Sequence, residues 1–371
     1  MLDMLQDNTA QRREDELHDR PVRCQWRRYY YRGMWFGVQA MQMEIPVVDL
    51  TSAFTGGATA RLHIGQQIDR ICREIGFFTI TGHGVPPDVI RGLNCKAHEF
   101  FALPMEEKQK VIPADITTPR GYKPIGYEAL GYGNANMTRP DLKEYYHFGR
   151  ESWPDEPYFT GPEGQRYFIT NVWPQRPEGF REAAARYYAE MEKLVGKLMR
   201  ITALGLGMEE HFFEDKIDRH ITAMRLNFYP SVKEPNNPGQ LRGGEHTDYG
   251  LLTILNGENV PGGLQVKTRT GAWVDVATNP DTFVVNIGDL LMRWTNDRWI
   301  SNVHRVAAPP GNAPGGERLS MAFFHHPNYD AVIECVAPCG KAKYPPVLSG
   351  EYRDFKYRQT RLMGTTASAT A

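Results

Sequence analysis

Apolar residues in the first half of the chain follow strand spacing in some stretches and helix spacing in others. Residues 45–50 form a short β-prone run, and residues 76–82 are typical of a buried strand that ends at a glycine. Between them, four isoleucines recur at helical spacing over residues 64–75. Further helices are predicted over residues 88–101 and, with a long apolar stripe, over residues 180–202.

The stretch of residues 112–140 is rich in glycine, proline and tyrosine and predicts a loop, and residues 145–148 predict a strand. After Ile221 the pattern changes to short β-prone runs separated by turn residues. The strands predicted there are residues 223–229, 250–255, 263–266, 273–276, 282–287, 303–306 and 318–324. Strands of this length and spacing indicate a β-sandwich or barrel. No Gly-x-Gly-x-x-Gly motif follows a strand and opens a helix, so a dinucleotide-binding fold has no support.

Composition narrows the function. The 371 residues include 43 Lys and Arg against 44 Asp and Glu, and 41% are hydrophobic, which is enough for a sizeable core. A charge so near zero argues against a nucleic-acid or membrane-surface binder, and no apolar run is long enough to span a bilayer. We therefore expect a monomer with a small-molecule substrate and, by default, a cytoplasmic location. Residues 1–42 are charged and lack the apolar core of a signal peptide, so we interpret them as a disordered or non-native extension.

A candidate metal site lies in the second half of the chain. His246 and Asp248 are separated by one residue, so on an extended segment their side chains point the same way. His304, flanked by β-prone valines, is a candidate third ligand. Two histidines and a carboxylate form the facial triad of non-haem Fe(II) oxygenases, which leaves coordination positions open for a co-substrate and O2. The His-x-Asp pattern alone also occurs by chance, so its surroundings decide its weight.

Two further residue patterns support a carboxylate-binding site beside the candidate metal site. Arg318 and Ser320 alternate like His-x-Asp and share a strand face, where a guanidinium fork and a hydroxyl suit the distal carboxylate of a dicarboxylate. Arg225, Asn227 and Tyr229 share a face of another predicted strand. Each pattern also has an ordinary structural interpretation, as a surface pair or as an exposed polar strand face.

At this point the chain resembles the isopenicillin-N-synthase-like branch of the 2-oxoglutarate/Fe(II) dioxygenases over roughly residues 45–357. The matching segments are residues 45–50, 76–86, 100–104, 141–144, 246–253, 262–266, 286–289, 301–306 and 318–320. The resemblance implies a mainly β fold with α-helices: a distorted double-stranded β-helix (jelly roll) core with an N-terminal mixed, helical region packed around it. The expected division is an N-terminal region at 43–205, the catalytic core at 206–345 and a C-terminal segment at 346–371.

The resemblance also assigns roles to residues. It implies that His246, Asp248 and His304 bind Fe(II), and that Arg318 and Ser320 hold the distal carboxylate of 2-oxoglutarate. Asn227 and Tyr229 match positions near the chelating end of this co-substrate, and Leu255 matches an apolar wall. The positions expected to line the substrate pocket are Tyr122, Tyr127, Tyr145, His147, Arg225, Phe324 and His326. If Arg225 faces the cavity, an anionic group on the substrate or co-substrate is favoured.

The implied activity is oxidative decarboxylation of 2-oxoglutarate to succinate, with O2, coupled to C–H oxidation of a small organic molecule by hydroxylation, desaturation or cyclisation. Three alternatives stay open. First, the chain could act like those family members that do not use 2-oxoglutarate as reductant, or like an ethylene-forming enzyme, which breaks 2-oxoglutarate itself into fragments. A non-catalytic ligand-binding protein could share the fold, although it has no need of a complete metal site. A zinc hydrolase needs an added general base and usually other ligand spacing.

Overall fold

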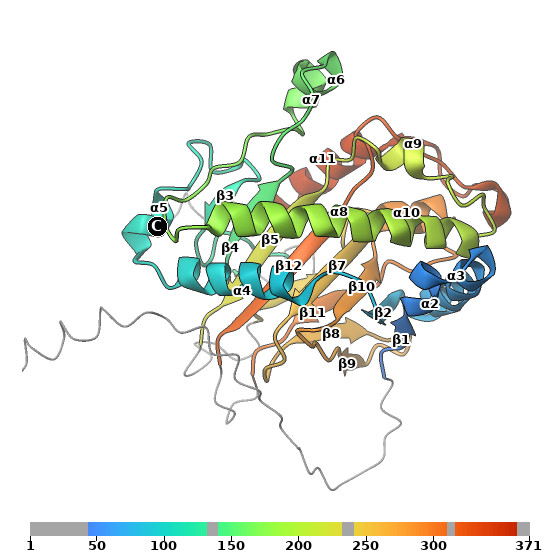
Figure 1. Ribbon diagram of the computed structural model, residues 1–371, viewed down its shortest axis with the longest axis horizontal. Helices are drawn as coiled ribbons and strands as arrows, with labels where there is room; N and C mark the ends of the chain where they lie inside the picture. Colours follow the sequence, from blue (N-terminus) through green and yellow to red (C-terminus); the bar gives the residue numbers. More distant parts are fainter. Residues whose placement is uncertain (1–43, 132–139, 232–240, 310–315, 362–371) are drawn as a thin grey trace, which may run out of the picture. The chain divides into compact units, whose positions relative to one another are not determined.

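Two antiparallel sheets carry most of the strands of the computed structural model, which describes residues 44–131, 140–231, 241–309 and 316–361 (Figure 1). The predicted extension at residues 1–42 lies outside the described residues. The strands of the larger sheet are β1 Val47–Asp49, β2 Phe77–Thr81, β3 Gly121–Lys123, β4 Glu144–Gly149, β5 Ala223–Tyr229, β7 Leu252–Gly257, β10 Phe283–Ile287 and β12 Arg318–His325. The strands of the smaller sheet are β6 Gly243–His246, β8 Leu264–Lys267, β9 Trp273–Asp275 and β11 His304–Val306.

The order of the larger sheet is β1-β2-β10-β7-β12-β5-β4-β3, and that of the smaller is β6-β11-β8-β9. Strands from before and after residue 206 therefore share one sheet. The first two strands pair in parallel, while every other described pair is antiparallel. A short pair, β13 Val332–Ile333 and β14 Val347–Leu348, precedes the last described helix.

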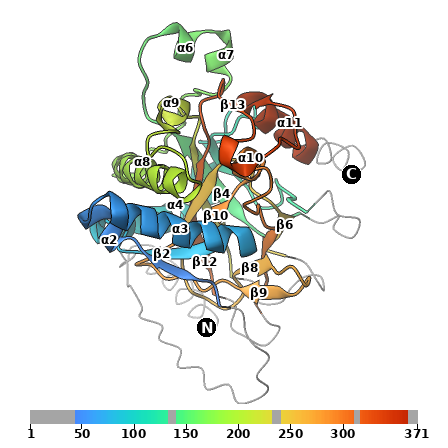
Figure 2. The same cartoon turned by 90° about the vertical axis from the view of Figure 1, so that its right-hand side faces the viewer.

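Helices cover one face of the larger sheet. In the view of Figure 2 they lie on one side of it, and the smaller sheet lies on the other. The three covering helices are α3 Ala58–Glu74, α4 Pro87–Phe101 and α8 Phe180–Gly205. The other helical segments are α2 Thr51–Thr55, α5 Met105–Gln109, α6 Pro157–Thr160, α7 Pro162–Gln165, α9 Glu214–Ile217, α10 Asp289–Trp294, η1 Ala337–Cys339 and α11 Ser349–Arg361. The architecture is mainly β with α, as predicted.

Residue alternation on the central strands separates the core from the candidate site. Met224, Leu226 and Phe228 of β5 belong to the hydrophobic core, and Phe228 stacks on Phe101 of α4 with ring centroids 5.1 Å apart. The intervening residues of β5 point to the opposite face, toward the smaller sheet. Phe77 and His304 meet edge to face there, with ring centroids 5.4 Å apart, so the inner faces of the two sheets are in contact. One side of the larger sheet is thus an apolar core, and the other carries polar and aromatic side chains that face the smaller sheet.

The structure departs from the predicted elements in several places, and the short helices and the strands β6, β13 and β14 were not predicted. Strand β7 begins two residues later than predicted, although the Leu251 N–H already donates to the His325 carbonyl at 2.8 Å. The predicted loop over residues 112–140 contains β3, which is only three residues long. Helix α11 was not predicted, because its sequence has no clear apolar stripe.

A close helix contact holds α3 against α8. A Cβ at Gly65 would lie 2.7 Å from the Ile201 carbonyl oxygen and 2.8 Å from the Gly205 nitrogen. We expect Gly65→Ala to lower the free energy of unfolding by about 1–3 kcal/mol, since added atoms force packed backbones apart. Gly196→Ala is the matched control in α8. Its Cβ would meet nothing within 4 Å, so we expect a gain of about 0.5–1 kcal/mol from helix propensity. Urea unfolding measures both, and equal effects would contradict the close contact.

Candidate active site

The sheet register brings the three predicted metal ligands together. His246 ends β6 and lies directly opposite His304 on β11, and Asp248 follows two residues later. The Nε2 of His246 is 3.9 Å from Asp248 Oδ1, and that of His304 is 3.8 Å from Asp248 Oδ2. One donor atom from each residue lies within 4.8 Å of the others. Such a group can surround a single metal ion.

Hydrogen bonds orient both histidines for metal binding. The Nδ1 of His246 is 2.7 Å from the Gly244 carbonyl, and that of His304 is 3.1 Å from the Asn302 carbonyl. A carbonyl only accepts, so each Nδ1 carries the proton and each Nε2 presents its lone pair. Burial is the main reason that the pKa of His246 is lowered to about 3, which keeps the ring neutral. The tautomers therefore suit metal ligation.

The carboxylate ligand is held in the same way. Asn286 on β10 donates to Asp248 Oδ2 at 2.7 Å. Burial raises the pKa of Asp248, but the two neighbouring histidines and the hydrogen bonds from Asn286 and Thr253 outweigh it, and the net pKa is lowered. Asp248 is thus an anion beside the two histidines. This donor set fits a divalent iron and leaves coordination positions free.

A cluster for a second carboxylate lies on the inner face of the larger sheet. Arg318 pairs with Tyr229 across the strands, and Ser320 pairs with Asn227. Arg318 is 1% exposed, and neither its Nη1 nor its Nη2 has a hydrogen-bond partner in the described part of the chain. The Ser320 hydroxyl is fully buried and equally unpartnered. Buried donors without acceptors are uncommon in folded proteins, so these three donors fit an anionic ligand that the chain does not itself supply.

Two residues that the sequence did not single out lie near Arg318. The backbone carbonyl of Glu258 accepts from Arg318 Nε at 3.3 Å, while the Glu258 carboxylate accepts the Leu319 N–H at 2.8 Å. Arg242 is fully buried and adds a second positive charge, since Arg318 contributes, after burial, to lowering its pKa. Leu255 lies near the guanidinium, because a Cβ at Gly257 would be 3.3 Å from Leu255 Cδ2 and 2.8 Å from Arg318 Nη2. No motif in the sequence singles out Glu258 or Arg242.

Residues predicted for the substrate pocket continue along the same face. Tyr145 pairs with Asn227, and His147 pairs with Arg225, so these side chains share the side that carries Arg318. The Arg225 guanidinium lies 4.2 Å from the Tyr145 ring centroid and 5.7 Å from that of Phe324.

His326 follows β12 and is 5% exposed. The negative charge of Asp248 is close enough to raise the pKa of its imidazole. The pKa of His326 is lowered to about 3, chiefly by burial. It is therefore a neutral ring near the carboxylate of Asp248.

The charge of Arg225 is already balanced by the protein. Its Nη1 lies 3.1 and 3.0 Å from the two carboxylate oxygens of Glu128. Lys143 contacts Glu128 at 2.9 Å and Asp141 at 3.1 Å, so two cations face two carboxylates. The expectation that Arg225 favours an anionic ligand is therefore corrected, because this ion pair uses its charge.

The two tyrosines expected to line the pocket are placed differently from each other. Tyr127 lies beside Tyr145, with ring centroids 6.4 Å apart, and its hydroxyl donates to the Ile116 carbonyl at 2.7 Å. Tyr122 pairs with Tyr146 and so points to the helix-covered face, where its hydroxyl donates to Glu144 at 2.5 Å. Tyr122 is part of the hydrophobic core and lies away from the candidate site. One residue of strand register separates the two faces.

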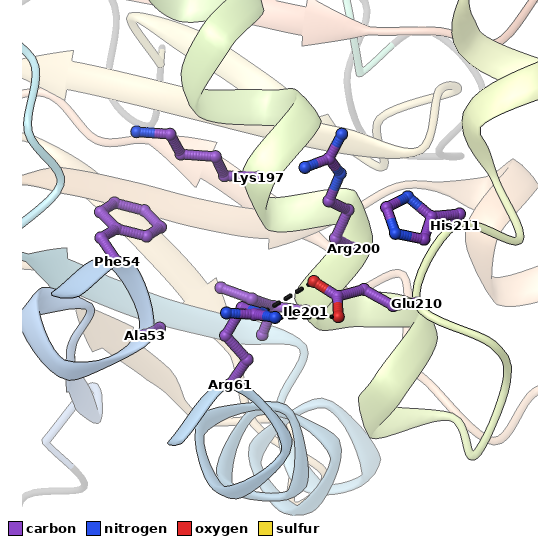
Figure 3. Close-up of a pocket in the computed structure, with 8 residues that line it drawn as sticks. All are labelled: Ala53, Phe54, Arg61, Lys197, Arg200, Ile201, Glu210 and His211. Carbon is purple, nitrogen blue, oxygen red and sulfur yellow. Dashed lines mark hydrogen bonds and ion pairs between the residues drawn. The ribbon is translucent and has the colours of Figure 1, made fainter. Parts of the chain in front are cut away.

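A hollow lies between α2, α3 and α8, and none of the candidate-site residues lines it (Figure 3). It has a volume of about 310 Å³ and is lined by Ala53, Phe54, Arg61, Lys197, Arg200, Ile201, Glu210 and His211. Its charges are partnered: Arg61 pairs with Glu210 at 2.7 Å, and Arg200 pairs with Glu214 at 2.6 Å. None of these lining residues is a predicted metal ligand or carries an unpartnered buried donor.

Within the described residues, no helix is both long and apolar enough to cross a membrane.

Comparisons with known proteins agree with this geometry. Residues 45–176 match the family described as non-haem dioxygenase in morphine synthesis N-terminal, and residues 221–327 match the 2OG-Fe(II) oxygenase superfamily. The chain is 34% identical to the 2-oxoglutarate-Fe(II) type oxidoreductase hxnY of Emericella nidulans, over 85% of this chain and 90% of the relative. It is 36% identical to a homoarginine-6-hydroxylase of Arabidopsis thaliana, over 76% and 81%.

Among solved structures, that of a full-length Neurospora crassa protein in complex with alpha-KG superposes with a TM-score of 0.75 at 32% identity, covering 87% of this chain and 98% of that one. The predicted jelly-roll class and the family resemblance are confirmed. Use of 2-oxoglutarate with Fe(II) and O2 on a small molecule is favoured over the alternatives that lack it. The chain therefore belongs to the 2OG-Fe(II) oxygenase superfamily and is a non-haem Fe(II)- and 2-oxoglutarate-dependent dioxygenase.

Proposed function

We propose that His246, Asp248 and His304 bind the Fe(II) of this dioxygenase. The observation that carries the proposal is the approach of three donor atoms to within 4.8 Å of one another, with both histidine Nε2 atoms free. When bound, the metal and 2-oxoglutarate supply the oxidising chemistry, in which O2 is consumed, 2-oxoglutarate becomes succinate and CO2, and a substrate C–H bond is oxidised. The protein holds the ligands in their tautomers and keeps the surroundings buried.

Arg318 and Ser320 bind the distal carboxylate of 2-oxoglutarate in this proposal. Their buried, unpartnered N–H and O–H donors support it, as does the absence of an ion-pair partner for Arg318 among the described residues. Asn227 and Tyr229 share the same face and orient the other end of the co-substrate, and Leu255 provides an apolar wall. These residues bind and orient the co-substrate, while a preorganised site reduces the entropy lost on binding.

The substrate lies, in the same proposal, against Tyr145, His147, Phe324 and His326, with Tyr127 at the edge. We further propose hydroxylation as the outcome, because several relatives are named as hydroxylases of small molecules, including homoarginine and proline. A monomeric state, a cytoplasmic location and the absence of nucleic-acid and membrane partners stay predictions. Light scattering on the purified protein measures the first of these.

Anaerobic reconstitution tests the co-substrate assignment. Purified protein with Fe(II) and 2-oxoglutarate should develop a weak visible charge-transfer band, and a His246→Ala variant should not. Folded wild-type protein without the band would contradict the assignment. Succinate release in air, measured with and without candidate substrates, separates a coupled oxygenase from a non-catalytic binder. Release of ethylene would support the alternative in which 2-oxoglutarate itself is fragmented.

A further inference from the structure

Helix α11, at the C-terminal end of the described chain, is tied to the loop that carries Asp248. Lys356 Nζ lies 2.8 Å from Asp289 Oδ2, and the Asp289 N–H donates to the Asp248 carbonyl at 2.8 Å. Tyr357 meets Tyr249, the residue after Asp248, edge to face at 5.7 Å. The start of the helix is equally fixed, since a Cβ at Gly350 would lie 2.5 Å from the Tyr167 hydroxyl. The helix therefore packs beside the candidate metal site.

The helix contributes a buried cation that has no ion-pair partner among the described residues. Arg353 is 4% exposed, and its Nε and Nη1 have no hydrogen-bond partner within the described residues. No carboxylate in the same ranges forms an ion pair with it. Its guanidinium lies between two aromatic rings, 5.5 Å from the Tyr167 centroid and 5.2 Å from the Tyr357 centroid. Buried charges are normally paired, because removing a charge from water without compensation is costly.

The neighbours of Arg353 reinforce the positive potential. Arg120 is also buried, donates to the carbonyls of Ile169 and Pro119, and has its pKa lowered to about 10 by burial and then by Arg353. His147 Nε2 and His326 Nδ1 are buried and have no partner in the described part of the chain. Burial lowers the pKa of both rings, and the charge of Arg353 lowers it further, so both rings are neutral.

His326 lies near both Arg353 and the candidate metal site. The charge of Arg353 lowers the pKa of its imidazole, and that of Asp248 raises it. Arg225 and Lys143, by contrast, face Glu128 and Asp141. The distal carboxylate of 2-oxoglutarate already has Arg318 and Ser320 in the proposed function. Neither the described residues nor the proposed co-substrate contacts therefore provide a negative partner for Arg353.

We propose that Arg353 of α11 binds an anionic group of the substrate, a carboxylate or a group of similar charge, with His147 and His326 as additional polar contacts. The substrate class is then a small organic anion whose acidic group points toward α11 while another part lies near the metal ligands. This inference rests on the proposed function, because it places the substrate beside the proposed iron and co-substrate residues. It makes Arg353 a specificity-determining residue and gives the C-terminal segment a role.

The test compares small carboxylates with their amides. Acetate, benzoate and phenylacetate are titrated by calorimetry into the full-length protein, anaerobically, with and without Fe(II) and 2-oxoglutarate, and at constant ionic strength. The corresponding primary amides have similar shape without the charge. We expect wild-type protein to bind at least one carboxylate about 10- to 100-fold more tightly than its amide, which is the range for a hydrogen bond to a charged group.

Arg353→Gln should bring that ratio close to one, and Arg353→Lys should retain part of it, since the lysine keeps the charge. Arg358→Gln, an exposed arginine on the same helix, is the matched control and should keep the wild-type ratio. The idea is overturned if wild-type protein prefers no carboxylate over its amide, if the preference survives Arg353→Gln, or if Arg353→Gln weakens 2-oxoglutarate binding instead. The visible band with Fe(II) and 2-oxoglutarate reports the proposed function separately, because the carboxylate preference is also measured without them.

Discussion

A His304→Ala variant is expected to lose Fe(II) binding and, with it, the turnover of 2-oxoglutarate. His304 is 6% exposed, and its Nε2 lies 3.8 Å from the Asp248 carboxylate. Removing it leaves only two of the three proposed ligands. Loss of an outer-sphere partner alone costs about 10- to 100-fold in metal affinity, so loss of a ligand should exceed about 100-fold. Competition with a chromogenic Fe(II) chelator measures the affinity, and succinate release measures turnover.

His63→Ala is the control for this substitution. His63 is exposed on α3, on the helix-covered side of the larger sheet. It should leave iron affinity and turnover at wild-type levels. If His304→Ala, still folded by circular dichroism, bound Fe(II) with wild-type affinity, the ligand assignment would have to be abandoned.

An Arg318→Gln variant is expected to lose affinity for 2-oxoglutarate while keeping its iron. The substitution removes the charge of a buried donor whose Nη1 and Nη2 have no other described partner. Truncating one partner of a buried, hydrogen-bonded charge pair costs about 2–5 kcal/mol, or roughly 30- to 5,000-fold in Kd. The visible band, titrated with 2-oxoglutarate under anaerobic conditions, gives that Kd, and chelator competition gives the iron affinity.

Arg305→Gln is the matched control, because Arg305 follows His304 on β11 but points out of the site. It lies 3.5 Å from Glu245, and its guanidinium stacks over Trp273 at 3.9 Å. Removing this nearby charge should change the Kd for 2-oxoglutarate by less than about threefold, since a partly exposed ion pair contributes little. Similar losses in both variants would mean that overall potential, rather than contact with Arg318, sets co-substrate affinity.

The candidate metal site could be predicted from the sequence because it depends on the spacing of residues that are close together in the chain. The one-residue spacing of His246 and Asp248, and of Arg318 and Ser320, fixes their relative directions wherever the segment is extended. Strand β5 was predicted with its observed bounds, because apolar and polar residues alternate from Met224 to Phe228. Short-range spacing therefore carried most of the site.

Long-range partners could not be predicted in this way. Arg225 meets Glu128, which lies 97 positions away in a loop, and no pattern at either residue indicates the other. Tyr122 was expected in the pocket, but a three-residue strand is too short for its sequence to show which face a side chain takes. Arg353 was not predicted as a site residue, because arginines are normally assigned to the exposed face of a helix. Each miss depends on tertiary pairing rather than on local pattern.

The position of α11 has a consequence for how such enzymes can diversify. The helix follows the last strand of the larger sheet and adds no strand to it, yet it brings Arg353 into the interior. With the role proposed for Arg353, exchanging this one segment between relatives is expected to alter substrate choice while the strands that carry the proposed iron ligands keep their sequence. Chimeras of this chain joined just after β14 are expected to carry that selectivity with the exchanged helix.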